Sequence, residues 1–167
     1  EKIFNRNRIL FLEDPIINID KINYLKNHKI EKKYTKKKFY VAIGRLTKQK
    51  NFLFSVRAIA KILKDQNLNL LILGEGEQKF KIQQLINEYG LNKKIFLTGY
   101  KKNIYKYLNR SEGLICTSLW EEPGFVIQEA EACKKMILTS NCESGPSEFL
   151  ENGLNGFVFL SDNIKSF

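Results

Sequence analysis

The feature that most constrains the fold is a regular alternation of short apolar runs and longer amphipathic segments, which starts at residue 39. The first run, 39–43, is uniformly apolar and of strand length, which indicates a buried strand. The next segment repeats apolar residues at helical spacing, and its predicted buried face consists of Leu53, Val56, Ile59, Ala60 and Leu63. Strict alternation of this kind predicts an α/β fold with a doubly wound, mostly parallel, Rossmann-like sheet.

The rest of the chain continues the alternation. Further strands are predicted at 68–73, 95–98, 113–117, 136–140 and 156–160. A second helix ends near Gly90, and its apolar residues are Phe80, Ile82, Leu85, Ile86 and Tyr89. Later helices are predicted at 103–109, 124–133 and 146–151. We expect one domain over 39–167, incomplete at its C-terminal end, after a Lys-rich interdomain segment at 1–38 that belongs to something larger.

The loops that follow the predicted strands should form one ligand site. Parallel sheets bind ligands beyond the carboxyl ends of their strands, where strand-to-helix loops converge. These loops are expected at 44–51, 74–77, 99–102, 117–124 and 141–147. Arg45, Lys50, Glu121 and Gly145 can therefore face one cleft although they are far apart in the sequence.

The fourth of these loops leads into a helix that is suited to an anion. Pro123 fits the first turn of a helix, where its missing N–H costs nothing. The amides expected to point beyond that helix end are those of Gly124, Phe125 and Val126. An anionic group is the natural ligand for such a position.

Two carboxylates flank this helix start. Glu129 would lie roughly 9 Å along the axis from Pro123, while Glu121 stays in the loop. We therefore expect them to bind separate parts of an extended ligand and not to share one proton. Glu143 and Glu151 repeat the same spacing, so the neighbouring residues carry the argument and the spacing does not.

Those neighbours resemble the retaining GT-B glycosyltransferases, the family called glycosyl transferases group 1, whose signature is two Glu separated by seven residues. Four landmarks between about residues 39 and 160 carry the resemblance. They are Gly44-Arg45-Leu-Thr-Lys-Gln-Lys50-Asn, Glu121-Glu-Pro-Gly-Phe-Val-Ile-Gln-Glu129-Ala130, Ser144-Gly145-Pro146-Ser-Glu148 and Asn152-Gly-Leu-Asn-Gly156-Phe. The Glu-Pro-Gly-Phe variant looks like a subgroup that works on bacterial surface polysaccharides.

The resemblance implies a role for each charged landmark. Arg45 and Lys50 would hold the diphosphate of a nucleotide sugar, since a departing diphosphate needs fixed cations. Glu121 would contact the donor sugar near its reacting carbon, with Glu122 as the alternative if the loop shifts by one residue. Glu129 would accept hydrogen bonds from the ribose hydroxyls.

The remaining positions shape the donor site. The segment 98–101, with Tyr100, would hold the nucleobase chiefly through backbone groups. Gly44 belongs to the phosphate loop, and Gly74 permits a close backbone approach in a tight turn. Gly145 would shape the adjacent loop, whereas Glu148 is interpreted as a helix-start residue.

The implied protein is the C-terminal donor-binding domain of a retaining hexosyltransferase, which uses a nucleoside-diphosphate sugar, with a UDP-sugar favoured, and needs no metal or other cofactor. An N-terminal acceptor-binding domain of the same protein is its expected partner, so this domain alone should bind donor but transfer little. The expected pathway is lipopolysaccharide or capsule synthesis at the cytoplasmic face of the membrane.

Composition is consistent with a cytoplasmic protein. No apolar run reaches the length of a membrane span, and the three cysteines are widely spaced, which favours reduced thiols. The net charge of +10 reflects many lysines, and their densest run is Lys29, Lys32, Lys33, Lys36, Lys37 and Lys38. These runs lack the interleaved aromatics of single-strand RNA binders, so a peripheral membrane contact is the preferred functional interpretation and nucleic acid is not expected. His28, the only histidine, has no evident partner for base catalysis.

Two alternatives remain open. A nucleotide-sugar 2-epimerase or a phosphorylase-like enzyme can contain a similar half. A non-enzymatic basic Rossmann-like module could instead bind RNA or anionic lipid through its lysines.

Overall fold

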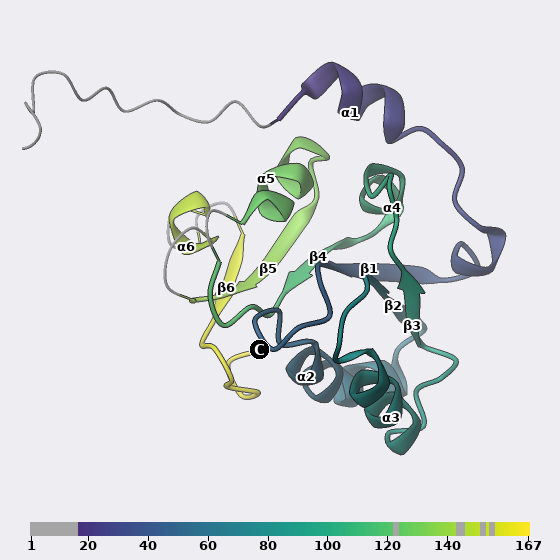
Figure 1. Ribbon diagram of the computed structural model, residues 1–167, viewed down its shortest axis with the longest axis vertical. Coiled ribbons are helices and arrows are strands. Elements are labelled where there is room, and N and C mark those ends of the chain that lie inside the picture. Colours follow the sequence, from purple (N-terminus) through teal and green to yellow (C-terminus); the bar gives the residue numbers. More distant parts are fainter. Residues whose placement is uncertain (1–16, 122–123, 143–145, 151–152, 154–155) are drawn as a thin grey trace, which may run out of the picture.

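The fold is a single six-stranded parallel sheet with helices on both faces (Figure 1). The computed structural model describes residues 17–121, 124–142, 146–150, 153 and 156–167. The strands are β1 (Lys38–Ile43), β2 (Leu68–Leu73), β3 (Ile95–Gly99), β4 (Gly113–Cys116), β5 (Met136–Ser140) and β6 (Phe157–Phe159). Their order across the sheet is β3-β2-β1-β4-β5-β6, so the chain reverses direction across the sheet between β1 and β4. The predicted fold class is confirmed.

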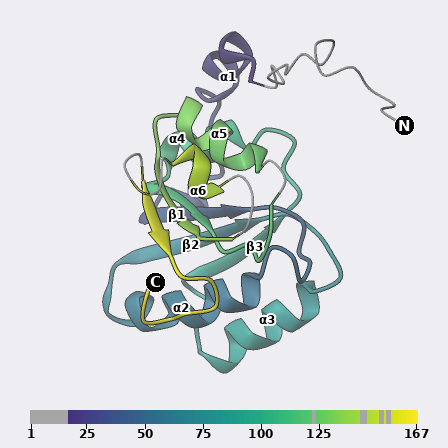
Figure 2. The same ribbon diagram turned by 90° about the vertical axis from the view of Figure 1, so that its left-hand side faces the viewer.

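The helices divide between the two faces (Figures 1 and 2). One face carries α2 (Phe52–Asp65) and α3 (Lys79–Glu88). The other carries α4 (Tyr105–Arg110), α5 (Phe125–Ala132) and α6 (Pro146–Phe149). Each strand therefore needs apolar side chains on both sides, which explains why the strands are continuous apolar runs without a polar alternation.

The core consists of two clusters, one on each face of the sheet. Successive strand residues point to opposite faces, so Val41 joins the cluster under α4 and α5 while Ala42 joins the cluster under α2 and α3. In β2, Leu71 and Leu73 face one way, and Leu70 and Ile72 face the other. The predicted face of α2 is confirmed, because Val56, Ile59, Ala60 and Leu63 are buried in the second cluster.

The segment before β1 adds side chains to the first cluster. It contains α1 (Ile19–Leu25) and a 3₁₀ turn, η2 (Lys32–Tyr34). Ile22, Ile30 and Tyr34 are buried, and the Tyr34 ring meets Phe96 of β3 edge-on at a centroid distance of 5.7 Å. The division of the chain at residue 38 stays a prediction.

The strand ends agree with the sequence prediction to within one residue, whereas the helices differ more. Helix α4 begins at Tyr105 and not at 103, and α6 ends at Phe149 and not at 151. Phe80 was expected on the apolar face of α3 and is 78 % exposed, because it lies two residues, or roughly 200° of helix turn, from buried Ile82. Tyr89 was expected on the same face, yet it follows the last helical residue as the C-cap and is also exposed.

A further difference concerns α5, which begins at Phe125 and not near Pro123. Gly124 is its N-cap and has φ 78°, a left-handed conformation that cannot continue a helix. Pro123 itself lies outside the described residues. Glu129 is consequently four residues from the helix start, or roughly 6 Å along the axis.

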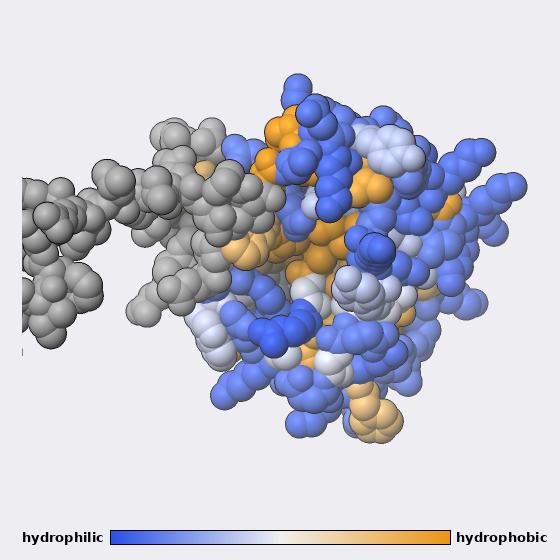
Figure 3. Space-filling view, turned by 45° about the horizontal axis from the view of Figure 1, so that its top comes forward, coloured by the Kyte–Doolittle hydropathy of each residue, from blue (hydrophilic) through white to orange (hydrophobic). Residues whose placement is uncertain are grey.

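The surface is mostly hydrophilic, with apolar residues gathered toward the middle of one face (Figure 3). Within the described part of the chain, no helix is both long enough and apolar enough to cross a membrane.

Candidate functional site

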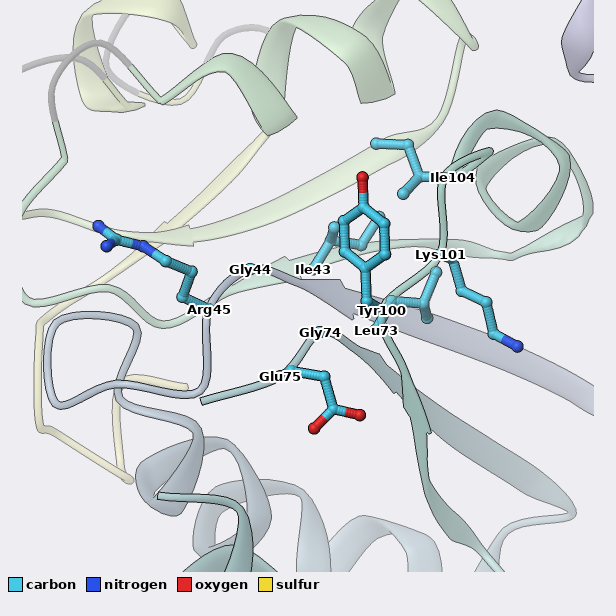
Figure 4. A pocket seen from close by; sticks show the side chains of 9 residues that line it. All are labelled: Ile43, Gly44, Arg45, Leu73, Gly74, Glu75, Tyr100, Lys101 and Ile104. Atoms are coloured by element: carbon cyan, nitrogen blue, oxygen red, sulfur yellow. The ribbon is translucent and has the colours of Figure 1, made fainter. Parts of the chain in front are cut away.

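A pocket of about 470 Å³ opens at the carboxyl ends of β1, β2 and β3 (Figure 4). Its lining consists of Ile43, Gly44, Arg45, Leu73, Gly74, Glu75, Tyr100, Lys101 and Ile104. Four of the predicted site residues, Gly44, Arg45, Gly74 and Tyr100, thus meet in one pocket. Its walls are largely apolar, and the Tyr100 ring stands between Gly44 and Ile104, so the pocket suits a flat, partly apolar group.

Backbone forms the floor of this pocket. The Gly44 N–H donates to the Leu73 carbonyl at 3.0 Å, and the Gly74 N–H donates to the Gly99 carbonyl at 3.0 Å. A Cβ on Gly74 would lie 1.8 Å from the Gly44 carbonyl oxygen, a distance that no side chain can occupy. The close backbone approach predicted at Gly74 is therefore present, and it lies between the loops that follow β1 and β2.

Lys50 and Glu121 form an ion pair across the point where the strand order reverses. Their side chains are only 16 % and 5 % exposed. The Ser118 hydroxyl donates a second hydrogen bond to the same carboxylate, at 2.5 Å. Burying a carboxylate costs free energy unless it is paired and hydrogen-bonded, and Lys50 and Ser118 provide both kinds of contact.

Further hydrogen bonds hold the loops of this ion pair together. The Leu119 N–H donates to the Gln49 carbonyl at 2.8 Å, and the Gln49 side chain returns a bond to the Trp120 carbonyl at 3.0 Å. The Thr117 hydroxyl donates to the Lys50 carbonyl at 3.0 Å. The loops after β1 and β4 therefore form one connected unit.

Glu129 has a different partner. The Tyr105 hydroxyl, at the start of α4, donates to Glu129 Oε1 at 2.9 Å. Burial raises the pKa of Glu129, and the hydrogen bond from Tyr105 offsets only part of this rise. Burial, followed by the bond to Glu129, raises the pKa of Tyr105 to about 12. The two carboxylates of the motif thus contact different side chains, and the expectation that they bind separate parts of a ligand stays a prediction.

The structure places the remaining predicted residues as follows. Phe125 is exposed and Val126 is half-buried in the first turn of α5, behind the N-cap Gly124. The Arg45 side chain extends away from the Tyr100 ring (Figure 4). Gly145, and the alternative Glu122, lie outside the described residues.

Several residues of the pocket and of the two carboxylate contacts escaped the sequence analysis. Ile43 and Leu73 are the last residues of predicted strands, so their positions alone could have identified them. Ser118 stands three residues before Glu121 within the quoted motif. Tyr105 had no such signal, because it reaches Glu129 from another helix.

Lys101 lines the pocket, yet its ammonium group points outward (Figure 4). It forms an ion pair with Glu31 at 2.9 Å, and the Tyr107 hydroxyl donates to the same carboxylate at 2.6 Å. Burial raises the pKa of Glu31, but the hydrogen bonds from Tyr107 and Lys101 outweigh it and lower the pKa to about 2. This cluster holds the segment before β1 against α4.

The three cysteines, Cys116, Cys133 and Cys142, are all buried and unpaired. Burial raises the pKa of the Cys133 and Cys142 thiols. The side chain of His28 lies edge-on to the Tyr24 ring and 3.4 Å from the Asn103 amide, and His28 is not among the residues that line the pocket.

Comparison with known proteins identifies the family. The profile of the family described as "Glycosyl transferases group 1" matches residues 23–167. This chain belongs to that family. The sheet of this group 1 chain has the Rossmann-like form found in GT-B glycosyltransferase structures.

Curated relatives agree with the assignment. The group 1 chain is 37 % identical over 154 residues to an uncharacterized glycosyltransferase of Methanocaldococcus jannaschii. The aligned region covers 89 % of this chain and 37 % of the relative. It is 35 % identical over 131 residues to the N-acetylgalactosamine-N,N'-diacetylbacillosaminyl-diphospho-undecaprenol 4-alpha-N-acetylgalactosaminyltransferase of Campylobacter jejuni, with 78 % of this chain and 35 % of that protein covered. The chain thus spans about a third of the length of these relatives.

A solved structure gives the same result. The group 1 chain superposes with a TM-score of 0.73 on a point mutant of Staphylococcus aureus TarM, solved in complex with fondaparinux, alpha-GlcNAc-glycerol and UDP. The sequence identity is 28 %, and the match covers 83 % of this chain and 28 % of TarM.

Proposed function

We propose that this chain is the donor-binding domain of a retaining glycosyltransferase, which takes a nucleoside-diphosphate sugar and passes the sugar to a polysaccharide or glycolipid acceptor. The observation that carries the proposal is that the Lys50–Glu121 ion pair adjoins the β1–β3 pocket: a Cβ on the pocket residue Gly44 would lie 3.0 Å from Cε of Lys50. TarM, a related structure, contains UDP, and the Campylobacter jejuni relative is named for a lipid-linked acceptor. A UDP-sugar is therefore the preferred donor.

The β1–β3 pocket is proposed to bind the nucleoside. Its apolar walls and the Tyr100 ring accept a flat base, while the backbone of the loop after β3 offers hydrogen bonds. Glu129, on α5, would accept hydrogen bonds from the ribose hydroxyls. Tyr105 uses only one of the lone pairs of the Glu129 carboxylate, so the others can serve the ribose. The base and the ribose would then be held by different elements of the fold.

The diphosphate would lie near the N-terminus of α5 and the loop after β1. Arg45 offers a planar fork of donors to phosphate oxygens. Lys50 has three N–H donors, so it can keep Glu121 and still donate to a phosphate. The positive end of the α5 dipole, where Gly124, Phe125 and Val126 lie, adds to this stabilisation. As the sugar departs, negative charge grows on the diphosphate, and these fixed groups stabilise it most in the transition state.

Glu121 is proposed to orient the donor sugar. Lys50 and Ser118 fix the position of its carboxylate, which would accept a hydrogen bond from a sugar hydroxyl. For transfer with retention, the acceptor hydroxyl attacks the anomeric carbon on the face that the diphosphate leaves. The bond from carbon to diphosphate oxygen breaks, the new glycosidic bond forms, and the hydroxyl proton passes to the departing phosphate oxygen.

We further propose that an N-terminal domain of the same protein supplies the acceptor site, and that the reaction takes place at the cytoplasmic face of the membrane. The surface that we propose for a peripheral contact lies at the opposite end of β1 from the donor pocket, around a hollow lined by Thr35, Lys36, Lys37, Lys38, Phe39, Arg110 and Glu112. Four cations and one carboxylate line that hollow, which favours an anionic surface.

Isothermal calorimetry with a panel of nucleoside diphosphates tests the donor site. We expect one of them, with UDP favoured, to bind, and we expect Arg45→Ala and Glu129→Ala each to weaken that binding at least tenfold, as for the loss of a charged hydrogen bond. Arg57→Ala on α2 and Glu131→Ala on α5 remove exposed groups of the same kind and should have no effect. Unaltered binding in both site variants would refute the proposal.

A further inference from the structure

Tyr105 connects one wall of the β1–β3 pocket to the carboxylate on α5. It is the first residue of α4, and the preceding residue, Ile104, lines the pocket beside Tyr100 (Figure 4). From there the Tyr105 hydroxyl reaches across to Glu129 Oε1 at 2.9 Å. The hydrogen bond therefore links the proposed base site to the proposed ribose site.

Among the residues that the structure describes, only Tyr105 donates a hydrogen bond to Glu129, which leaves Oε2 as an acceptor. A carboxylate has two oxygens, and Tyr105 donates to Oε1. A glutamate side chain has three rotatable bonds, so without a fixed donor it samples several orientations, and ordering it on ligand binding costs free energy. The half-buried hydrogen bond from Tyr105 to the carboxylate restricts these orientations before a ligand binds.

We propose that Tyr105 is a positioning residue that orients the Glu129 carboxylate toward the ribose hydroxyls of a bound nucleoside diphosphate. This inference rests on the proposed function, because it assigns the ribose to Glu129. It adds that recognition of the ribose depends on a side chain from α4 that lies outside every landmark of the sequence motif.

Tyr107 provides a matched control on the same helix. Its hydroxyl also donates to a carboxylate, that of Glu31, at 2.6 Å. Burial, followed by the bond to Glu31, raises the pKa of Tyr107, just as burial and Glu129 raise the pKa of Tyr105. The two tyrosines thus form the same kind of bond, but only that of Tyr105 leads to the proposed ribose site.

The test compares two ligands in calorimetry on the 167-residue chain. The ligands are the nucleoside diphosphate that binds best and its 2′,3′-dideoxy analogue, and the variants are Tyr105→Phe and Tyr107→Phe. We expect Tyr105→Phe to weaken binding of the nucleoside diphosphate about three- to tenfold, the usual effect of one lost hydrogen bond. Binding of the dideoxy analogue should weaken less than twofold. Tyr107→Phe should leave the ratio of the two dissociation constants unchanged.

A double-mutant cycle isolates the pair. Glu129→Gln should remove most of the ribose discrimination, and adding Tyr105→Phe to that variant should remove little more, because the two residues act together. A second readout is pH. Loss of the Tyr105 bond should raise the pKa of Glu129 further, so binding by Tyr105→Phe should decline at a higher pH than in the wild type. Cys133 and Tyr105 are the titratable groups that interact with Glu129, and both of their pKa values are already raised.

The outcomes separate the two proposals. If the wild type binds none of the nucleoside diphosphates, the proposed function fails, and this inference fails with it. If the wild type discriminates against the dideoxy analogue and Tyr105→Phe keeps the same ratio, whether by weakening both ligands equally or neither, only the positioning role is refuted. Thermal unfolding of each variant, compared with Tyr107→Phe, shows whether a general loss of structure explains equal weakening.

Discussion

Lys50 and Glu121 are 71 residues apart in the sequence and form a buried ion pair that joins the loop after β1 to the loop after β4. These two strands are neighbours at the reversal of the strand order. The pair therefore stabilises the fold at the place where a ligand is expected to bind. Its charges serve structure and, on our proposal, donor binding.

Removing one member of this pair should destabilise the protein strongly. Lys50→Met leaves the Glu121 carboxylate buried with one partner fewer, and we expect the free energy of unfolding to fall by about 3 kcal/mol. Urea denaturation monitored by circular dichroism measures the change. Lys48→Met removes an exposed lysine from the same loop and should cost less than about 0.5 kcal/mol. Equal stability of the two variants would show that the ion pair has no structural role.

Gly74 should tolerate no side chain. In Gly74→Ala the new Cβ would meet the Gly44 carbonyl oxygen at 1.8 Å, so the loops after β1 and β2 must separate. We expect a loss of several kcal/mol in unfolding free energy, together with weaker nucleoside diphosphate binding. Gly90 also has a positive φ, of 67°, but a Cβ there would meet no atom within 4 Å. Gly90→Ala should therefore cost only about 1 kcal/mol, and a comparable loss in the two variants would argue against a close contact.

Stability should depend on pH through Glu31. The folded state lowers the pKa of this carboxyl from 4.5 to about 2, so protonation opposes folding. The stabilisation is complete above about pH 4.5 and is lost as the pH falls toward 2. Free energies of unfolding measured across this range should decrease less steeply for Glu31→Gln than for the wild type. Glu75→Gln removes an exposed ion pair with Lys79 and serves as the control, which should follow the wild-type curve. Coinciding curves for Glu31→Gln and the wild type would contradict the assignment.

As the pH falls, nucleoside diphosphate binding should begin to weaken at a higher pH than an ordinary glutamate would cause. Burial raises the pKa of Glu129, and a protonated carboxyl accepts fewer hydrogen bonds from a ribose. Affinity should therefore decline at a pH above the ordinary carboxyl range, and calorimetry between pH 4 and 8 measures the decline. In Glu129→Gln, which cannot ionise, this part of the pH dependence should disappear. Its persistence there would assign the titration to another group.

Much of the fold could be predicted from local patterns. Burial on both faces requires continuous apolar strands, so the runs at 39–43 and 68–73 located β1 and β2 within one residue. The errors in the helices have separate origins. Phe80 lies two residues from Ile82, so the helical period itself places it on the opposite face of α3. The start of α5 was predicted too early because the left-handed conformation of Gly124 is a property of the folded loop.

The candidate site was predictable only in part. Parallel topology brings strand ends to one edge, so the meeting of Gly44, Arg45, Gly74 and Tyr100 followed from the sequence pattern. Individual contacts did not follow, since a strand end specifies an edge of the sheet and leaves side-chain direction open.

The sequence by itself determined the doubly wound sheet, the edge at which the charged loops meet and the family to which the chain belongs. Only the tertiary structure decided that Lys50 pairs with Glu121 and that Tyr105 holds Glu129. The reason is physical. Periodicity reports which residues are buried along one element, whereas an ion pair or a hydrogen bond depends on distances of about 3 Å between elements, and packing alone sets those distances.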